Sequence, residues 1–511
     1  MKGLAARLEA PAAWLFADGW RFLVPYQLAL LAALVTGVGV PRLRLAFLAL
    51  HAAAIPLLLL LAVRRRGAIT APAALAWAGL ALVFLLPGAY LEFPSDAWEH
   101  LRRLYAEQGL QRLDEPPGGL RMAYFLGYSL VGGVAVAGRR LALGLLAAAW
   151  QMLLAFAVYR FARRVGFGPR WAFLQVVASV ALMGTGPFAF YRYYALSSTP
   201  LAYAAYLAAL GALLDVARGR LRPGLLDLLL ATLLVAGNHR QELLFLAISA
   251  AGVALSALTA RRAAAWLGAG LLALASLALL ARLAGLPAAL PAGPGSGSPH
   301  FAAWGAVRLL DPRLPYLGTL GYHGLLGLAL APLLWRRQPL LCWLTLLPPL
   351  LLLFPPAVWL VAALHGSTPA PMHYRLLFAF PTSFLLVAGL RQAVARLRAR
   401  GLRVPVAVAA VPLLAFGALG SGFAGGRLWF QLLRPGDAAS LVPLDATAEW
   451  LESQRLARGA WRPRELASID LAGPAPPPST RCLVVSDAAT SFALAAQLGF
   501  VTFVELSLIH I

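Results

Sequence analysis

Apolar runs of about twenty residues recur from one end of this 511-residue chain to the other. A helix needs ~20 such residues to cross about 30 Å of hydrocarbon, and lipid admits only helices and closed barrels as spanning structures. Hydrophobic residues make up 61% of the chain, the mean hydropathy is +0.75, and only 12% of residues are charged. The sequence therefore predicts an all-α polytopic membrane protein.

The length rule predicts about thirteen transmembrane helices. The apolar segment 121–138 is not counted, because its glycines weaken it as a helix and because counting it would reverse every later span. We expect this segment to be interfacial or re-entrant. The predicted spans are 22–40, 44–63, 71–90, 141–159, 171–190, 200–217, 224–237, 243–258, 264–283, 319–335, 339–354, 376–390 and 404–422.

Arginine-rich connections predict the orientation of these spans. With Arg64–Arg66 on the cytoplasmic side, alternation places the other short arginine-rich loops on that side too, as the positive-inside rule requires. The N-terminus is then cytoplasmic and the C-terminus extracytoplasmic. The net charge of +23 does not indicate nucleic-acid binding, because the arginines punctuate apolar runs instead of forming one soluble patch. The basic residues are almost all arginine rather than lysine, and Ala, Gly and Pro are abundant, which suggests a GC-rich bacterial genome. We therefore expect the protein to lie in a bacterial inner (plasma) membrane.

A membrane domain over 1–422 is therefore expected, with its longer connections outside. These are a first large outer loop at 91–140, a second at 286–318 and an outer re-entrant segment at 355–375. The extracytoplasmic region 423–505 contains Cys482–Asp487, which indicates a buried strand, and Ala488–Leu498, which indicates a helix. We expect the start of a small α/β domain there.

The final six residues, Leu506–Ile511, are the translation of CTGTCTCTTATACACATC, a transposase end used in sequencing libraries. We expect them to be a sequencing-adapter artefact and the native chain to run past Glu505, so they are set aside from fold reasoning.

The stretch Asn238–Glu242 places His239, Arg240 and Glu242 between two apolar runs. Such groups cost several kcal/mol beside hydrocarbon unless they are paired or face water. One interpretation is an anion site, since arginine offers a planar charged fork for phosphate and histidine can bond the same oxygens. The other is an internally paired Arg240–Glu242 cap that joins two short helices.

A second candidate lies in the first outer loop, where Asp96, Glu99 and Arg103 recur at helical spacing. One carboxylate there would act as a general base on an acceptor hydroxyl. The alternative is a surface helix whose first-turn acids complement its dipole.

Two further groups lie at predicted outer ends of spans. His373 and Arg375 would join Arg240 in neutralising a phosphate or diphosphate, or Arg375 simply snorkels to the interface. Tyr191 and Arg192 would line the same cavity, or belong to an interfacial aromatic belt. No Walker A loop, dinucleotide fingerprint, HExxH or GxSxG motif is present in the sequence, which argues against an ATP-driven pump or a soluble-type hydrolase.

This layout resembles the GT-C superfamily of polyprenyl-phosphate-sugar-dependent integral membrane glycosyltransferases. The matching elements are the acidic motif Asp96…Glu99 in the first large outer loop, the 139–164 segment with its basic inner flank, the outer His/Arg/Glu groups and the extracytoplasmic C-terminal region. The resemblance implies that Asp96 is the catalytic base and that Arg240 and Arg375 hold the donor phosphate.

The same resemblance implies a lipid-linked sugar donor in the membrane and a glycan, lipid or protein acceptor. Two extra spans precede the acidic loop, and no two acids are adjacent there. These departures leave open whether Asp96 or Glu99 is the base and whether a divalent metal is a cofactor. A transporter or flippase for a lipid-linked glycan is the alternative function. It would require ionisable residues near the bilayer midplane, whereas Asp215 and Asp227 are expected to flank the inner side.

Overall fold

The computed structural model describes only part of the chain. The described residues are 18–38, 42–43, 45–54, 70–88, 121–131, 136–183, 198–239, 241–283, 301–304, 307–310, 321–354, 356–357, 376–377, 379–402, 404–413, 483–486 and 502–505. Most of the predicted outer loop 91–140, the outer re-entrant segment 355–375 and the region 423–505 lie outside them.

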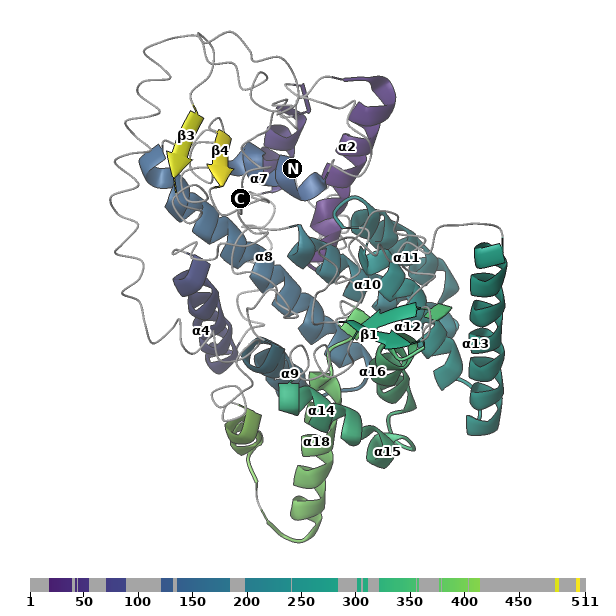
Figure 1. Cartoon of the computed structure of the whole chain (residues 1–511). Helices are drawn as coiled ribbons and strands as arrows, with labels where there is room; N and C mark the ends of the chain where they lie inside the picture. Colours follow the sequence, from purple (N-terminus) through teal and green to yellow (C-terminus); the bar gives the residue numbers. More distant parts are fainter. Residues whose placement is uncertain are drawn as a thin grey trace, which may run out of the picture.

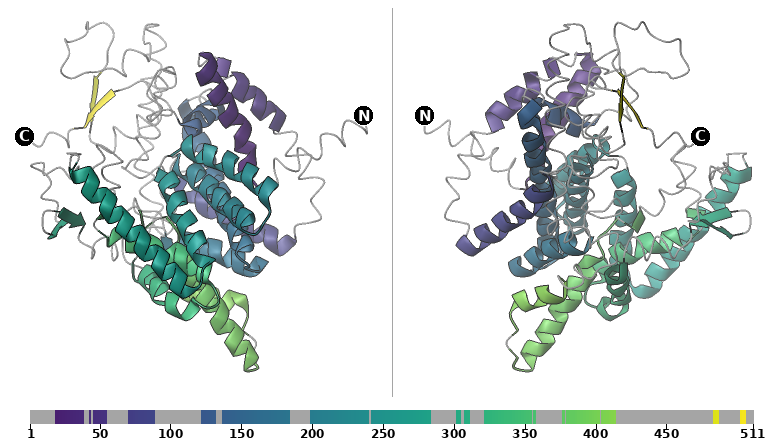
Figure 2. Two further views of the ribbon diagram at one scale, coloured as in Figure 1. Left: turned by 90° about the vertical axis from the view of Figure 1, so that its right-hand side faces the viewer. Right: turned by 60° about the vertical axis from the view of Figure 1, so that its left-hand side comes forward.

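The described residues form a bundle of α-helices accompanied by two small pairs of strands (Figures 1 and 2). The helices in chain order are η1 Trp20–Leu23, α2 Val24–Thr36, α4 Ala71–Gly88, α7 Met122–Val131, α8 Val136–Arg164, α9 Pro169–Met183, α10 Thr199–Ala217, α11 Leu221–Ala236, α12 Gln241–Ser256, α13 Ala260–Leu283, α14 Gly321–Ala329, α15 Ala331–Leu334, α16 Pro339–Leu352, α18 Ser383–Ala399 and η5 Val406–Ala409. A further apolar helix runs over Leu45–Ala54.

Helix α10 is the centre of the bundle. Its residues are buried almost without interruption from Thr199 to Ala212, and it packs against α8, α11 and α12. Small residues make this close approach feasible, as in membrane helix pairs generally. A Cβ on Gly211 would lie 2.2 Å from an Arg164 nitrogen, and one on Gly224 would lie 2.8 Å from the Val216 side chain. Neither glycine can be enlarged without displacing its neighbour.

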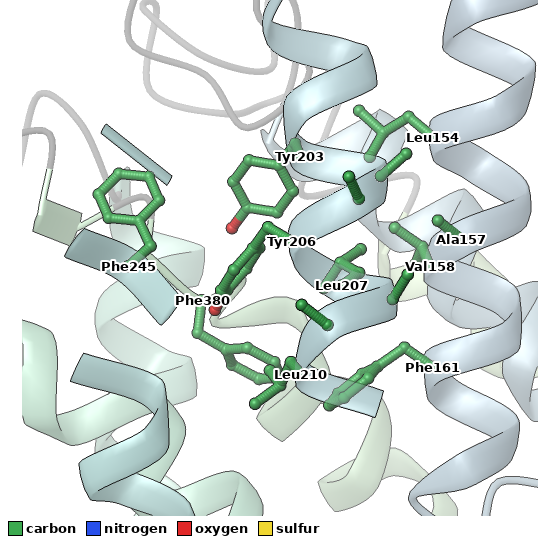
Figure 3. Close-up of a cluster of buried hydrophobic side chains, with 14 of the residues drawn as sticks. Leu154, Ala157, Val158, Phe161, Tyr203, Tyr206, Leu207, Leu210, Phe245 and Phe380 are labelled. Carbon is green, nitrogen blue, oxygen red and sulfur yellow. The ribbon is translucent and has the colours of Figure 1, made fainter. Parts of the chain in front are cut away.

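Aromatic side chains fill the space beside α10 (Figure 3). The rings of Tyr203 and Tyr206 lie edge to face at 5.0 Å, and both contact Phe245 of α12. Their hydroxyls donate to the Ala379 carbonyl, at 3.0 and 2.6 Å, and the Tyr206 hydroxyl is also 2.7 Å from Ser249 Oγ. These bonds satisfy polar atoms that would otherwise be costly in the core.

The structure confirms the helical fold class that was expected from the sequence. Within the described residues, three helices are long and apolar enough to cross a membrane: Gly144–Arg164, Thr199–Ala217 and Ala260–Leu280. Several other apolar helices are shorter than the predicted spans that they overlap. Helix α7 has ten residues, about 15 Å of helix, which is too short to cross a bilayer.

Two helices differ in extent from the predicted spans. The predicted span 319–335 is divided between α14 and α15, with Leu330 between them and Pro332 in the first turn of α15. Helix α18 continues to Ala399, through the arginines that were expected to form a loop. Arginine is a good helix former, so the basic segment extends the helix until Gly401, whose φ of +85° ends it.

Helix α13 packs against α12 and otherwise stands apart from the bundle (Figure 1). Only 6% of its apolar window is buried, and leucines along it are more than half exposed. An apolar cavity of about 810 Å³ lies between α12, α13 and α16, lined by small and leucine side chains and by Trp266. This surface suits contact with hydrocarbon rather than with water.

The four strands lie in predicted extramembrane regions. Strands β1 Phe301–Trp304 and β2 Val307–Leu310 form an antiparallel pair. Strands β3 Leu483–Ser486 and β4 Thr502–Glu505 pair in parallel, with Leu483 opposite Thr502. Strand β3 falls where the sequence predicted one. A parallel pair needs a crossover connection, and the predicted helix Ala488–Leu498, which lies outside the described residues, occupies that position in the sequence.

Candidate functional site

The turn between α11 and α12 holds a buried asparagine that connects two distant parts of the chain. Asn238, 1% exposed, donates from Nδ2 to the Leu234 carbonyl at 2.8 Å. Its Oδ1 accepts from the backbone N–H of Ala123 at 3.0 Å. The side chain therefore satisfies a free carbonyl near the end of α11 and a free N–H at the start of α7.

A backbone bond reinforces this connection, because the N–H of Met122 donates to the Gly237 carbonyl at 2.9 Å. Gly237 also contacts α2: a Cβ at this position would lie 2.1 Å from Gln27 Oε1. Gln27 is 3% exposed, so its side chain occupies the space that the glycine leaves. Three elements, α2, α7 and α11, thus meet at one end of the bundle.

Arg121, the residue before α7, lies at this meeting point. Its Nη1 donates to Ser198 Oγ at 2.8 Å and to the Tyr124 hydroxyl at 3.3 Å. The guanidinium carbon also lies 5.8 Å from the centre of the Tyr124 ring. Ser198, 0% exposed, precedes α10, so Arg121 joins the starts of α7 and α10.

His239 and Glu242 form a close pair in the same turn. The distance from His239 Nδ1 to Glu242 Oε2 is 2.6 Å, and their side chains are 14% and 1% exposed. Glu242 lies in the first turn of α12, where the positive end of the helix dipole favours a carboxylate. We call Arg121, Ser198, Asn238, His239 and Glu242 the junction cluster.

The structure tests only part of the predicted site. The structure brings His239 and Glu242 into contact. Arg240 lies outside the described residues, so the predicted Arg240–Glu242 cap stays a prediction. The other predicted residues lie outside the described residues: Asp96, Glu99, Arg103, Tyr191, Arg192, Arg240, His373 and Arg375. The roles of these residues therefore stay predictions, and so does the use of a divalent metal.

Arg121, Ser198 and the bridging role of Asn238 were not predicted. Arg121 and Ser198 are 77 residues apart in the sequence, and neither belongs to a recognisable motif. The position of Arg121 directly before an apolar segment was the one available signal, because a charge there needs a partner.

A network of charged side chains lies where α10 ends and α11 begins, at the end of these two helices away from the junction cluster. Arg21 contacts Asp227 through Nε at 3.2 Å and Nη2 at 2.6 Å, and its Nη2 lies 3.0 Å from Asp18 Oδ2. All three residues are 7–8% exposed. Arg160 donates to the same Asp18 from Nε at 2.9 Å and from Nη2. The carboxylates therefore accept the two-pronged hydrogen bonds that arginine forms best.

The network continues toward the surface through Asp215. Arg164 Nη2 lies 3.8 Å from Asp18 and 3.7 Å from Asp215, and Arg220 lies 3.7 Å from Asp215. These contacts connect η1 with α8, α10 and α11. We call this set of three aspartates and four arginines the basic-end network. The sequence placed Asp215 and Asp227 at this level but did not predict their pairing with Arg21 or the part played by Asp18.

A third polar group crosses between helix Leu45–Ala54, α2 and α7. The hydroxyl of Tyr26 lies 2.8 Å from His51 Nδ1, and His51 Nε2 lies 2.9 Å from Ser129 Oγ. Ser129 donates its hydroxyl proton to the Leu126 carbonyl at 2.8 Å. A neutral imidazole has one donor and one acceptor, so Nε2–H donates to Ser129 and Nδ1 accepts from Tyr26. The histidine thereby connects its own helix to both α2 and α7.

Comparison of the chain with protein-family models, with curated proteins and with solved structures found no match.

Proposed function

We propose that this protein is a GT-C-like membrane glycosyltransferase that moves a sugar from a polyprenyl-phosphate donor to an acceptor hydroxyl at the junction cluster. The observation that supports this most is the convergence of Arg121, His239 and Glu242, from two distant segments, at one end of a largely apolar bundle. Ionisable groups are placed in such surroundings at a cost, and they commonly mark a site.

In this proposal the junction cluster faces the extracytoplasmic side of the bacterial inner membrane. The arginines of the basic-end network and of α18 lie at the other end of their helices, where the positive-inside rule favours the cytoplasm. The N-terminus is then cytoplasmic and the C-terminus extracytoplasmic. The lipid-linked donor enters from the outer leaflet, with its anionic group against the cluster.

The proposed reaction is a displacement at the anomeric carbon. Asp96, or Glu99 in its place, accepts the proton of the acceptor hydroxyl, whose oxygen forms a bond to that carbon. The bond from the anomeric carbon to the phosphate oxygen breaks, and the lipid phosphate leaves with the electron pair. General-base catalysis of this kind contributes about 10²–10⁴-fold.

Arg240, Arg375, His373 and His239 would stabilise the charge on the departing phosphate. Preorganised donors aimed at such a charge are each worth ~10²–10³ in rate. Glu242 accepts from Nδ1 of His239, which orients the ring and directs Nε2 away from the carboxylate. Arg103, Tyr191 and Arg192 would line the same cavity.

Sugar transfer in proteoliposomes tests the proposal. The full chain is supplied with a radiolabelled polyprenyl-phosphate sugar and with glycolipid, oligosaccharide and peptide acceptors. We expect Asp96→Asn and Arg240→Ala to lower the transfer rate about a hundredfold or more. The control is Arg391→Gln, which alters an arginine at the opposite end and should leave transfer unchanged. Full activity of folded Asp96→Asn and Arg240→Ala proteins would reject these assignments.

One observation favours the alternative of a transporter or flippase for a lipid-linked glycan. Asp18, Arg21 and Asp227 are buried, and Asp227 lies within the apolar helix α11. Buried ionisable groups of this kind mark pathways in transporters. The same proteoliposomes without acceptor distinguish the two functions. Movement of the labelled lipid between leaflets, abolished by Asp227→Asn, would support transport, whereas its absence together with sugar transfer would support the enzyme.

A further inference from the structure

Arg121 differs from the arginines of the basic-end network in what surrounds its charge. Arg21, Arg160, Arg164 and Arg220 each have an aspartate within 4 Å. The described contacts of Arg121 are two neutral hydroxyls and an aromatic ring, and within the described part of the chain no carboxylate pairs with it. Because the residue is half-buried, its charge is only partly compensated by solvent.

Two other described arginines for which no carboxylate contact is seen, Arg218 and Arg391, contact backbone carbonyls at the end of a helix, which is a favourable position for a cation. Arg218 donates to the Arg164 carbonyl and Arg391 to the Gly166 carbonyl, both at the end of α8. The negative end of that helix compensates their charge. Arg121 lies instead at the starts of α7 and α10, whose positive ends oppose a cation and favour an anion.

The guanidinium of Arg121 also has donors to spare. A guanidinium presents five N–H donors in a planar fork, and the contacts with Ser198 and Tyr124 both use Nη1. Nε and Nη2 have no partner among the described residues, and together they match two oxygens of a phosphate. Asn238 fixes the start of α7, so the fork is held in place before a ligand arrives.

From these contacts we propose that Arg121 is the anchor of an anion-binding site that takes a phosphate group, either from a phospholipid-like headgroup or from free phosphate. Ser198 and Tyr124 orient the guanidinium, and the starts of α7 and α10 add favourable potential. The site is inferred from the surroundings of Arg121 and does not depend on sugar transfer. Its chemistry is recognition of an oxyanion, with no bond made or broken.

Binding to the purified full chain in phosphatidylcholine nanodiscs tests this site. The probes are farnesyl phosphate, farnesol and inorganic phosphate. We expect farnesyl phosphate to bind and Arg121→Gln to weaken that binding about tenfold to a hundredfold, while the affinity for farnesol is unchanged. Competition by inorganic phosphate identifies free phosphate as a ligand. Its failure to compete identifies the lipid headgroup. The matched control, Arg391→Gln, removes a guanidinium whose contacts are also not carboxylates.

A measurement on the unmodified protein covers the case in which Arg121→Gln does not fold. Phenylglyoxal modifies accessible arginines, and mass spectrometry of the digested protein reports the extent at each site. We expect farnesyl phosphate to protect Arg121 at least fivefold and to leave Arg391 unprotected. Equal modification of Arg121 with and without the ligand, or equal affinity of folded Arg121→Gln, would overturn the site. Phosphate binding that depends on Arg121 in a protein without transferase activity would reject the proposed function alone.

Discussion

At the scale of single residues, Asn238 is the most consequential side chain of the junction cluster. Its amide uses an acceptor and a donor to bond two backbone groups 111 residues apart, Ala123 N–H and the Leu234 carbonyl. An aspartate would lose the donor, and an aliphatic residue would lose both. The position therefore requires both halves of the amide, because its surroundings exclude water that could replace either bond.

We predict that Asn238→Leu lowers the free energy of unfolding by about 2–4 kcal/mol, because it leaves a buried N–H and a buried carbonyl without partners. Reversible unfolding in mixed detergent micelles would measure this change. Thr36→Val is the control, since the Thr36 hydroxyl bonds the Ala32 carbonyl at an exposed site and its loss should cost less than about 0.5 kcal/mol. Equal stability of the two variants would contradict the bridging role of Asn238.

At the scale of elements, the basic-end network fastens the first helix of the structure to the bundle. Arg21 belongs to η1, and its carboxylate partners come from the preceding turn and from α11. Arg160 and Arg164 extend the connection to α8. Apolar contacts alone would define the position of this helix less well than these ion pairs do, since the leucine and alanine surfaces of many helices are interchangeable in lipid.

We predict that Asp227→Leu lowers the free energy of unfolding by about 3 kcal/mol, because Arg21 keeps only one of its two carboxylates. The double variant Arg21→Leu/Asp227→Leu should recover most of that loss, since an apolar pair is tolerated where a lone charge is not. Arg220→Gln is the control. Its contact with Asp215 is long and its side chain is 71% exposed, so we expect less than about 1 kcal/mol. A double variant no more stable than Asp227→Leu would argue against ion pairing.

Much of this element level could be predicted from the sequence. Helices α4, α10, α12, α13 and α16 lie within a few residues of their predicted spans, because long apolar runs with polar ends have few other structures. The length rule does not predict how far a helix continues beyond lipid, which is why the extension of α18 to Ala399 was missed. It also does not predict partners between helices, such as Arg21 with Asp227.

The same limit applies to the candidate site. The cost of charge beside apolar runs drew attention to His239 and Glu242. The contact between them was not predicted from the sequence. Arg121 and Ser198 meet only because α7 packs against the end of α11. That packing joins segments that are far apart in the sequence. Sequence periodicity carries no information about it.

At the scale of the whole molecule, charge is separated between the two ends of the bundle. The basic-end network and the arginines of α18 lie at one end, and the junction cluster lies at the other. Under the positive-inside rule, this separation favours the orientation that the proposed function requires.

Labelling of single cysteines in whole cells would test that orientation. In a background without Cys342 and Cys482, we predict that a membrane-impermeant maleimide labels Ala236→Cys, next to the junction cluster, and does not label Arg336→Cys until the cells are permeabilised. Both positions are exposed in the structure. The reverse pattern would place the junction cluster in the cytoplasm and reject the proposed use of an outer-leaflet donor.

The pairing of Arg21 with Asp227 also bears on biosynthesis, because 206 positions separate the two residues. A ribosome adding about 5–20 residues per second needs roughly 10–40 s to make the intervening chain. During that interval the first helix has been synthesised but its aspartate from α11 does not exist. Asp18, three residues away, is available from the outset and can shield the arginine while the insertion machinery holds the helix. Asp18 can therefore pair with Arg21 before Asp227 has been synthesised.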